Sequence, residues 1–394
     1  MRKNAVNKQL QSIEGGVCAP EGFKANAVAC GIRTDGGLDF GMLFSDKRCA
    51  VACAYADTPF LGAPVKVSNR NMKYGYARAV LVNGGVANCI SSDGEHLAES
   101  VCDLFGRYGV ERTETIIAST GRMGEKLTFA PFEKGAKALW EGLASSPENS
   151  LRLAQSITAN EGCPKELSFQ FMLGDYPCKI GAVFTGSHNN ATTFLAFLTT
   201  DVNVSSEMLS RALSSAVRET VALINVGVSS PNDTVCILSS GKAGNYKITC
   251  PDGEYKKFAD VLKNVLVEIC KTAIRDAQGE KNLYVRVGGA KSKKVSRALA
   301  KKIAGLCAVK REMVAGTMDV DVLLCALLCE EELLDPSRIQ ISVESVFGAL
   351  VLFEEGKRIP FSKERICAVL RCDEITIRVD LGEGNFESTA YGRV

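Results

Sequence analysis

Two adjacent threonines, Thr192 and Thr193, stand directly before an apolar run that ends in a further threonine pair and an aspartate at residues 199–201. A threonine hydroxyl at the mouth of a buried strand can attack the carbonyl group of the preceding residue. If the peptide bond is then hydrolysed, the threonine becomes a new N-terminus, and its α-amine, with a pKa of about 7.7–8.0, can deprotonate its own hydroxyl. Both residues are therefore candidates for self-cleavage and nucleophilic catalysis. The same composition also fits an ordinary Thr-rich strand, because threonine suits a half-buried pleated surface.

Two short turns could supply further groups. Residues 119–124 are rich in small side chains and follow an apolar, strand-like segment. Such a turn can direct a backbone N–H and the Thr120 hydroxyl to one point, which is what an oxyanion hole requires. Residues 232–234, Asn-Asp-Thr, precede another apolar run and are equally typical of an Asx turn. Neither segment identifies a site by itself, because glycine and Asx turns next to strands are common.

The cysteines and histidines form no recognisable metal motif. None of the sixteen cysteines lies in a Cys-x-x-Cys pair, and most have apolar neighbours. Only two histidines, His96 and His188, occur in the chain. We therefore expect buried free thiols and no metal site.

Length and composition bound the class of protein. A chain of 394 residues is long enough for two domains and a sizeable core, and its 46% hydrophobic and 23% charged residues are ordinary for a globular protein. The formal net charge of +2 gives no indication of a nucleic-acid or membrane partner. The N-terminus lacks the pattern of a signal peptide and the apolar runs are too short to span a bilayer, so we expect a cytoplasmic protein.

The apolar patterning predicts alternating strands and helices, and hence an α/β (α+β) fold. We expect strands at residues 79–83, 116–118, 166–173, 178–185, 193–199, 235–238 and 282–288. We expect helices after residues 91–95, at residues 131–145 and 149–160, from residue 205 onward, and at residues 255–275 and 293–306. Short strands should dominate from about residue 335. A cluster of Gly, Pro and Asn at residues 240–255 predicts a boundary between domains 1–245 and 246–394.

The order of several motifs is more specific than any one of them. They lie at residues 15–23, 82–85, 119–121, 191–195, 199–201 and 232–234. This series resembles the ornithine acetyltransferase family, the bifunctional glutamate N-acetyltransferases of arginine biosynthesis. The resemblance extends from about residue 15 to residue 392, nearly the whole chain. It implies a layered αββα sandwich of the N-terminal-nucleophile type with a smaller C-terminal α/β domain.

The resemblance also implies a mechanism. Cleavage between Thr192 and Thr193 would give an α chain of residues 1–192 and a β chain of residues 193–394. Thr193 would be the nucleophile, and Thr120 and Gly121 would form the oxyanion hole. Acetyl would pass from N-acetylornithine to Thr193 and then to glutamate. The substrate would be an amino acid or an N-acyl amino acid, and acetyl-CoA would be an alternative acetyl donor. The resemblance implies no resident cofactor. It also implies an assembly of two α and two β chains.

The chain departs from the family pattern where substrate is bound. The family lysine near the nucleophile aligns with Ala182 or, with a gap, with Thr185. The family glutamate becomes Gln278, and the Thr-Thr-Asp turn becomes residues 159–161 with Asn160 at its centre. The resemblance therefore transfers substrate contacts to Asn160, Thr185 and Gln278. An apolar segment at residues 318–323 replaces a polar loop, and the C-terminal segment that closes over substrate has no counterpart.

The sequence is compatible with three hypotheses. The chain could be a divergent threonine acyltransferase with an altered amino-acid substrate. It could be a true ornithine acetyltransferase in which other residues or a partner subunit supply the missing groups. It could also be a non-catalytic paralogue that acts as a structural or regulatory partner.

Overall fold

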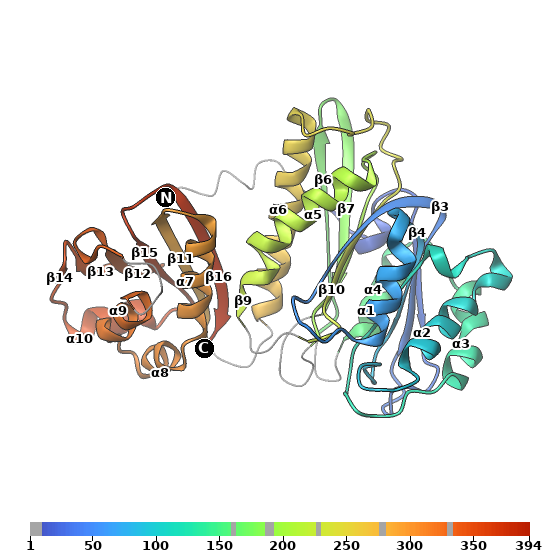
Figure 1. Cartoon of the computed structure of the whole chain (residues 1–394), viewed down its shortest axis with the longest axis horizontal. Helices are drawn as coiled ribbons and strands as arrows, with labels where there is room; N and C mark the ends of the chain where they lie inside the picture. Colours follow the sequence, from blue (N-terminus) through green and yellow to red (C-terminus); the bar gives the residue numbers. More distant parts are fainter. Residues whose placement is uncertain (1–9, 159–162, 186–192, 226–229, 276–280, 329–333) are drawn as a thin grey trace. The chain divides into compact units, whose positions relative to one another are not determined.

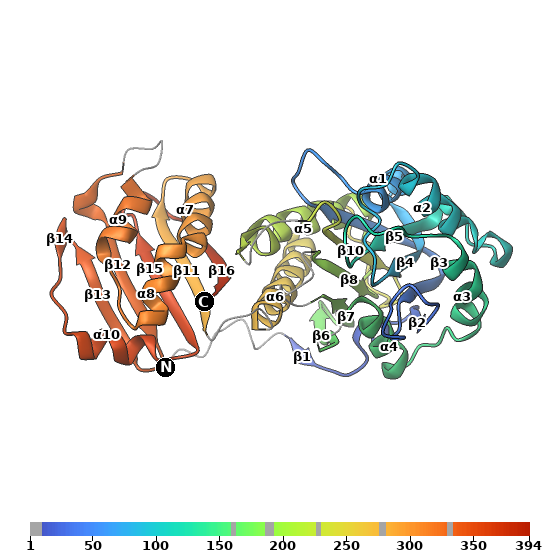
Figure 2. The ribbon, with the colours of Figure 1, turned by 90° about the horizontal axis from the view of Figure 1, so that it is seen from below.

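The computed structural model describes residues 10–158, 163–185, 193–225, 230–275, 281–328 and 334–394. The described chain forms two compact units, the first within Met1–Gly186, Asn190–Ala216 and Ser229–Val265 and the second mostly within Leu266–Val394. Each unit contains one β-sheet and covering helices, so the predicted mixed α/β class is confirmed (Figures 1 and 2). The boundary at residues 245 and 246 stays a prediction about independently folding domains.

In the first unit, nine described strands form one sheet in the order β1-β6-β7-β8-β10-β3-β4-β5, with β2 paired to β3. The strands predicted from apolar patterning are confirmed here with small shifts at their ends. The bounds are β1 Gln11–Ser12, β2 Lys24–Val28, β3 Phe40–Tyr55, β4 Tyr76–Asn83, β5 Thr115–Ser119, β6 Lys165–Leu173, β7 Tyr176–Phe184, β8 Leu195–Thr200 and β10 Thr234–Ser239.

Strand β3 takes part in both halves of this sheet. Its first part pairs with β2 and β4, its last part pairs with β10, and the register with β4 shifts between Phe44 and Cys49. Side chains from both halves then meet in one buried cluster, which includes Val80 of β4, Leu195 of β8 and Cys236 of β10. The same cluster includes Leu153, Ala154 and Ile157 of helix α4 (Pro147–Ile157), so this helix packs against that side of the sheet.

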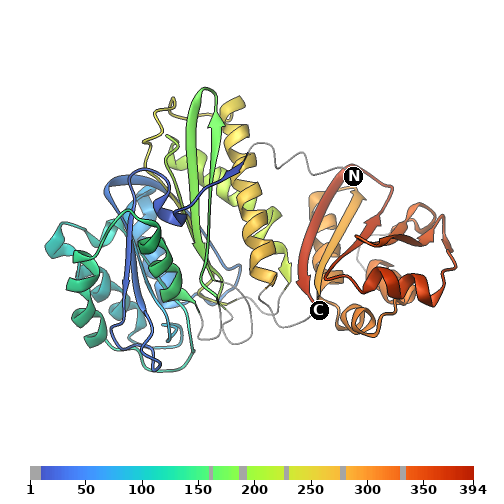
Figure 3. The same ribbon diagram turned by 180° about the vertical axis from the view of Figure 1, so that it is seen from behind.

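The other helices of the first unit lie around this sheet, as Figures 1 and 3 show. Helices α1, α2 and α3 pack on the opposite side of β4 and β5, against Ala79, Leu81 and Ile117. Helices α5 and α6 lie beside β6, β7, β8 and β10 (Figures 1 and 2). The bounds are α1 Ala63–Asn71, α2 Gly94–Asp103, α3 Ala130–Glu141, α4 Pro147–Ile157, α5 Ser206–Glu219 and α6 Gly253–Arg275.

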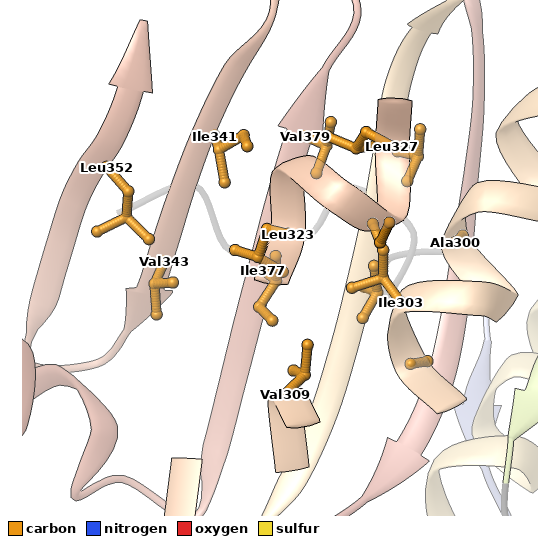
Figure 4. Packing of buried hydrophobic residues seen from close by; sticks show 14 of the residues in the cluster. Ala300, Ile303, Val309, Leu323, Leu327, Ile341, Val343, Leu352, Ile377 and Val379 are labelled. Carbon is orange, nitrogen blue, oxygen red and sulfur yellow. The ribbon is translucent and has the colours of Figure 1, made fainter. Parts of the chain in front are cut away.

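The second unit contains a sheet in the order β14-β13-β12-β15-β11-β16-β9. Its strands are β9 Ile224–Asn225, β11 Asn282–Ala290, β12 Gln340–Ser345, β13 Gly348–Glu354, β14 Lys357–Arg358, β15 Glu374–Asp380 and β16 Phe386–Arg393. Its helices are α7 Lys293–Gly305, α8 Cys307–Ala315, α9 Val320–Leu328 and α10 Lys363–Leu370. Apolar side chains of α7, α8 and α9 pack on the sheet, with Leu323 and Ile377 in the centre (Figure 4).

Sequence patterning predicted α7 and β11 but missed α8, α9 and α10. The segment at residues 318–323 contributes the first turn of α9, and Leu323 and Leu327 of this helix are completely buried. Their spacing of four residues is typical of a helix that covers a sheet. In the described part of the chain, no helix combines the length and apolar character needed to cross a membrane.

Candidate functional site

The first unit places Thr193 two residues before β8, with its side chain buried. The Thr193 hydroxyl lies 2.9 Å from the hydroxyl of Ser230, and either oxygen can be the donor. Both side chains are almost completely inaccessible, at 3% and 1% exposure. A buried hydroxyl at a strand start, with one defined polar partner, has a fixed direction and little competition from water.

Main-chain pairing of β8 with β10 fixes the position of Thr193. The two strands are parallel, with Leu195 opposite Thr234. The N–H of Thr234 donates to the carbonyl oxygen of Phe194 (2.9 Å), and the N–H of Phe194 donates to Oδ1 of Asp233 (2.6 Å). The residue after Thr193 is therefore bonded on both sides, so the nucleophile candidate lies at the end of a rigid element.

Thr185 bonds to the same strand start from the other side. Its hydroxyl donates to the carbonyl oxygen of Thr193 (3.1 Å) and accepts from the N–H of Leu195 (2.9 Å). Its own N–H donates to the carbonyl oxygen of Leu195 (2.8 Å). The structure thus places this predicted substrate contact beside Thr193, but commits its hydroxyl to main-chain groups. Its contact with substrate stays a prediction.

The turn before β10 connects Thr193 with the end of β5. The N–H of Asn232 donates to the Ser230 hydroxyl (3.2 Å), and the side-chain amide of Asn232 donates to the carbonyl oxygen of Ser119 (3.2 Å). Because Ser119 is the last residue of β5, this bond brings the turn to the segment that carries Thr120. Long-range folding, rather than proximity in the sequence, therefore assembles this group.

Thr120 and Gly121 form a tight bend directly after β5. The N–H of Thr120 donates to the carbonyl oxygen of Asn83 (2.9 Å), and the buried Thr120 hydroxyl has no hydrogen-bond partner within the described protein. Gly121 has a φ of +128°, and a Cβ atom there would lie 2.2 Å from the carbonyl carbon and oxygen of Gly85. Only glycine fits this close approach. The predicted role of both residues in an oxyanion hole stays a prediction.

Asp233 is the ionisable group of this region. Its two carboxylate oxygens accept from the N–H of Phe194 (2.6 Å) and of Ser230 (3.0 Å). Burial raises the pKa of the Asp233 carboxyl group to about 7, and these two donors oppose the rise. A carboxyl group with such a pKa changes its charge near neutral pH, as groups in functional sites often do.

The Asn-Asp-Thr pattern of residues 232–234 indicates a turn, but it predicts no role for Asp233 or for Ser230. The only available signal was a polar turn of residues 230–234 before an apolar strand, which does not indicate what the turn contacts. The other predicted residues, Thr192, Asn160 and Gln278, lie outside the described part of the chain. Ala182, the ungapped alternative for the family lysine, is buried in β7 opposite Leu198.

Comparison with known families gives a match over nearly the whole chain. The ArgJ family model matches residues 24–393. The chain belongs to the ArgJ family. This confirms the resemblance to ornithine acetyltransferases inferred from the order of the motifs, and members of the family are acetyltransferases of arginine biosynthesis.

Curated relatives match the chain over nearly its full length. The arginine biosynthesis bifunctional protein ArgJ of Symbiobacterium thermophilum is 32% identical over 392 residues, which are 97% of this chain and 96% of that protein. The protein of the same name from Geobacillus stearothermophilus is 30% identical over 387 residues, 96% of this chain and 93% of the relative.

Solved structures are also similar to parts of the chain. The ornithine acetyltransferase of Mycobacterium tuberculosis, determined in complex with ornithine, is 22% identical with a TM-score of 0.41; the match covers 46% of this chain and 96% of that one. ArgJ of Bacillus halodurans is 21% identical with a TM-score of 0.42, covering 46% of this chain and 98% of that structure.

Proposed function

We propose that this chain is a self-processing N-acyltransferase that uses Thr193 as its nucleophile. Cleavage between Thr192 and Thr193 frees the α-amine of Thr193, which then serves as the base for its own hydroxyl. The acyl group passes from an N-acyl amino acid to Thr193 and then to the amino group of a second amino acid. Thr120 and Gly121 stabilise the negative charge that develops on the acyl oxygen.

The position of Thr193 is the observation that carries this proposal. Its buried hydroxyl lies at the start of β8, 2.9 Å from a second hydroxyl, in a chain that belongs to a family of acetyltransferases. Nucleophilic threonines need a fixed orientation and an adjacent base, and an N-terminal residue contains both groups. The β8–β10 pairing supports the fixed orientation, because Phe194 is bonded on both sides.

We propose further that the amino-acid substrate differs from the ornithine and glutamate pair. Neither alignment of the family lysine supplies a positive charge here. Ala182 is an apolar residue buried in β7, and the hydroxyl of Thr185 is bonded to the main chain at Thr193 and Leu195. A substrate held by charge in the family would lose that contact in this site, so a less polar or differently charged amino acid fits better.

Mass measurement of the purified protein under denaturing conditions tests the first step. We expect two chains, residues 1–192 and 193–394, and a single uncleaved chain after Thr193→Ala. A single chain in the unmodified protein would contradict the proposed enzyme. That result would favour the alternative of a non-catalytic paralogue with a structural or regulatory role, which the changed substrate positions support.

Transfer assays on the processed protein test the substrate. N-Acetylornithine, other N-acyl amino acids and acetyl-CoA serve as donors, with a panel of amino acids as acceptors. We expect the highest kcat/KM outside the ornithine and glutamate pair. Activity confined to that pair would refute the altered substrate and leave the acyltransferase proposal intact.

The proposed assembly contains two α and two β chains. Cleavage would separate β7 from β8 in the covalent chain, although these strands are antiparallel neighbours in one sheet. The two products should therefore stay together after processing. The doubling to an α₂β₂ heterotetramer rests on the family resemblance. Native mass measurement should give twice the mass of one α and one β chain, and a single pair would contradict it.

A further inference from the structure

Self-cleavage presents a chemical problem that the processed enzyme does not have. In the intact chain the nitrogen of Thr193 belongs to a peptide bond, so it carries no basic lone pair. Attack by the Thr193 hydroxyl on the preceding carbonyl carbon therefore requires another group that takes the proton from Oγ1. After cleavage the free α-amine, with a pKa of about 7.7–8.0, performs this task.

Ser230 is the polar side chain placed for that transfer. Its Oγ lies 2.9 Å from Oγ1 of Thr193, within the range of a strong O–H···O hydrogen bond. It also accepts the N–H of Asn232 at 3.2 Å. A hydroxyl has one proton to donate and two lone pairs, so Ser230 can accept the proton of Thr193 while it gives up its own.

The side chain of Asp233 accepts hydrogen bonds from the backbone at Ser230 and next to Thr193. One oxygen accepts from the N–H of Phe194, the residue after Thr193, and the other accepts from the N–H of Ser230. A single carboxylate therefore connects the backbones of residues that are 37 positions apart in the chain. Hydrogen bonds to both oxygens leave the Asp233 side chain little freedom to rotate, which makes this connection rigid.

We propose that Ser230 is a catalytic proton shuttle of the self-cleavage step and that Asp233 is its positioning residue. The proposal rests on the self-processing proposed above. The bond between Thr193 Oγ1 and the Thr192 carbonyl carbon forms, and the bond from that carbon to the Thr193 nitrogen breaks. The proton leaves Oγ1 for Ser230, and the proton of Ser230 passes to the leaving nitrogen. Water then hydrolyses the ester, which leaves a carboxylic acid on Thr192 and restores the Thr193 hydroxyl.

The rate of cleavage after cell-free synthesis tests this step. Denaturing mass measurement follows the intact chain with time for the unmodified protein and for Ser230→Ala, Ser230→Thr and Ser68→Ala. Ser68 is the matched control, because its hydroxyl is also fully buried in the first unit, where it bonds to the carbonyl oxygen (2.7 Å) and the N–H (2.8 Å) of Ile117. Its removal affects stability but no proton transfer.

We expect Ser230→Ala to cleave about 10²–10⁴-fold more slowly, the usual range for loss of an acid–base group. Ser230→Thr keeps the hydroxyl and should recover most of the rate, and Ser68→Ala should cleave like the unmodified protein. Once processed, Ser230→Ala should lose far less of its acyl-transfer kcat than of its cleavage rate. Equal losses in both would indicate a merely structural role and overturn the proposal.

Two outcomes separate this inference from the proposed function. An unmodified chain that never cleaves contradicts self-processing itself, and the shuttle with it. Cleavage of the unmodified chain together with an unchanged rate in Ser230→Ala overturns the shuttle alone. If Ser230→Ala does not fold, the cleavage rate of the unmodified protein is measured in mixtures of H₂O and D₂O. Transfer of two protons in the rate-limiting step makes the cleavage rate a curved function of the deuterium fraction. A linear dependence would overturn the shuttle.

Discussion

Replacing Asp233 by asparagine should change how the free energy of unfolding depends on pH. Burial raises the pKa of the Asp233 carboxyl group from its ordinary 3.8 to about 7. Between these values the folded protein retains a proton that the unfolded chain has released. The stability of the unmodified protein must therefore fall as pH rises through this window, and the full cost of the buried charge is present above pH 7. Asparagine does not titrate, so the variant lacks this contribution.

The magnitude follows from the linkage of proton binding to folding. Each pH unit in which the folded state holds one additional proton changes the free energy of unfolding by about 1.4 kcal/mol. Between pH 5 and pH 8 the unmodified protein should lose about 3 kcal/mol relative to Asp233→Asn. A separate offset, independent of pH, arises because the amide can accept only one of the two N–H donors of Phe194 and Ser230, and an unpaired buried donor costs about 1–3 kcal/mol.

Urea unfolding at pH 5, 6, 7 and 8 measures this difference. Both proteins carry Thr193→Ala, so that the chain stays intact during the measurement. Titration of all other groups is common to the two proteins and largely cancels in the comparison. A difference in unfolding free energy that does not change from pH 5 to pH 8 would refute the raised pKa and the burial from which it follows.

Three further substitutions test other parts of the structure. Gly121→Ala should lower the thermal unfolding midpoint, because a side chain in the left-handed backbone region costs about 1–2 kcal/mol and the new Cβ overlaps Gly85. The control Gly106→Ala should leave the midpoint unchanged, because a Cβ there meets no atom within 4 Å. Thr185→Val should lower the free energy of unfolding, measured by chemical denaturation, by about 1–3 kcal/mol, because it leaves main-chain groups at the start of β8 unpaired. Thr185→Ser keeps the hydroxyl and should recover most of this loss. Leu323→Ala should destabilise the second unit by about 2–5 kcal/mol without slowing cleavage. A slower cleavage rate would contradict the proposal that groups of the first unit alone carry out this step.

Local periodicity was sufficient for most elements of the first unit. Strands such as β4 and β5 alternate between the inner cluster, which contains Val80 and Ile116, and the outer cluster, which contains Leu81 and Ile117. Both faces are apolar, so a continuous apolar run between turns identified them. Helix α9 was missed because the apolar stretch of residues 320–328 is short, and a short apolar run does not distinguish a helix from a strand.

The candidate site was predictable only in part, because its residues come from separate segments. Thr193, Thr120 and Gly121 were named from motifs whose order resembles that of a known family. Ser230 and Asp233 were not, since a hydroxyl or carboxylate in a polar turn is common and nothing in the local pattern indicates its partner. Their significance comes from bonds to Thr193 and Phe194, which lie in another part of the chain.

The sequence by itself determined the fold class and the family, and through the family resemblance it predicted Thr193 as the nucleophile. These features depend on residue types, their spacing and their order. The tertiary structure decided what surrounds that threonine. Strand β3 pairs with both β4 and β10 and so joins the two parts of the sheet, and the turn before β10 reaches Ser119 across 113 residues. Burial of Asp233 and the pairing of Ser230 with Thr193 exist only in that folded arrangement, because each depends on groups that the unfolded chain keeps apart.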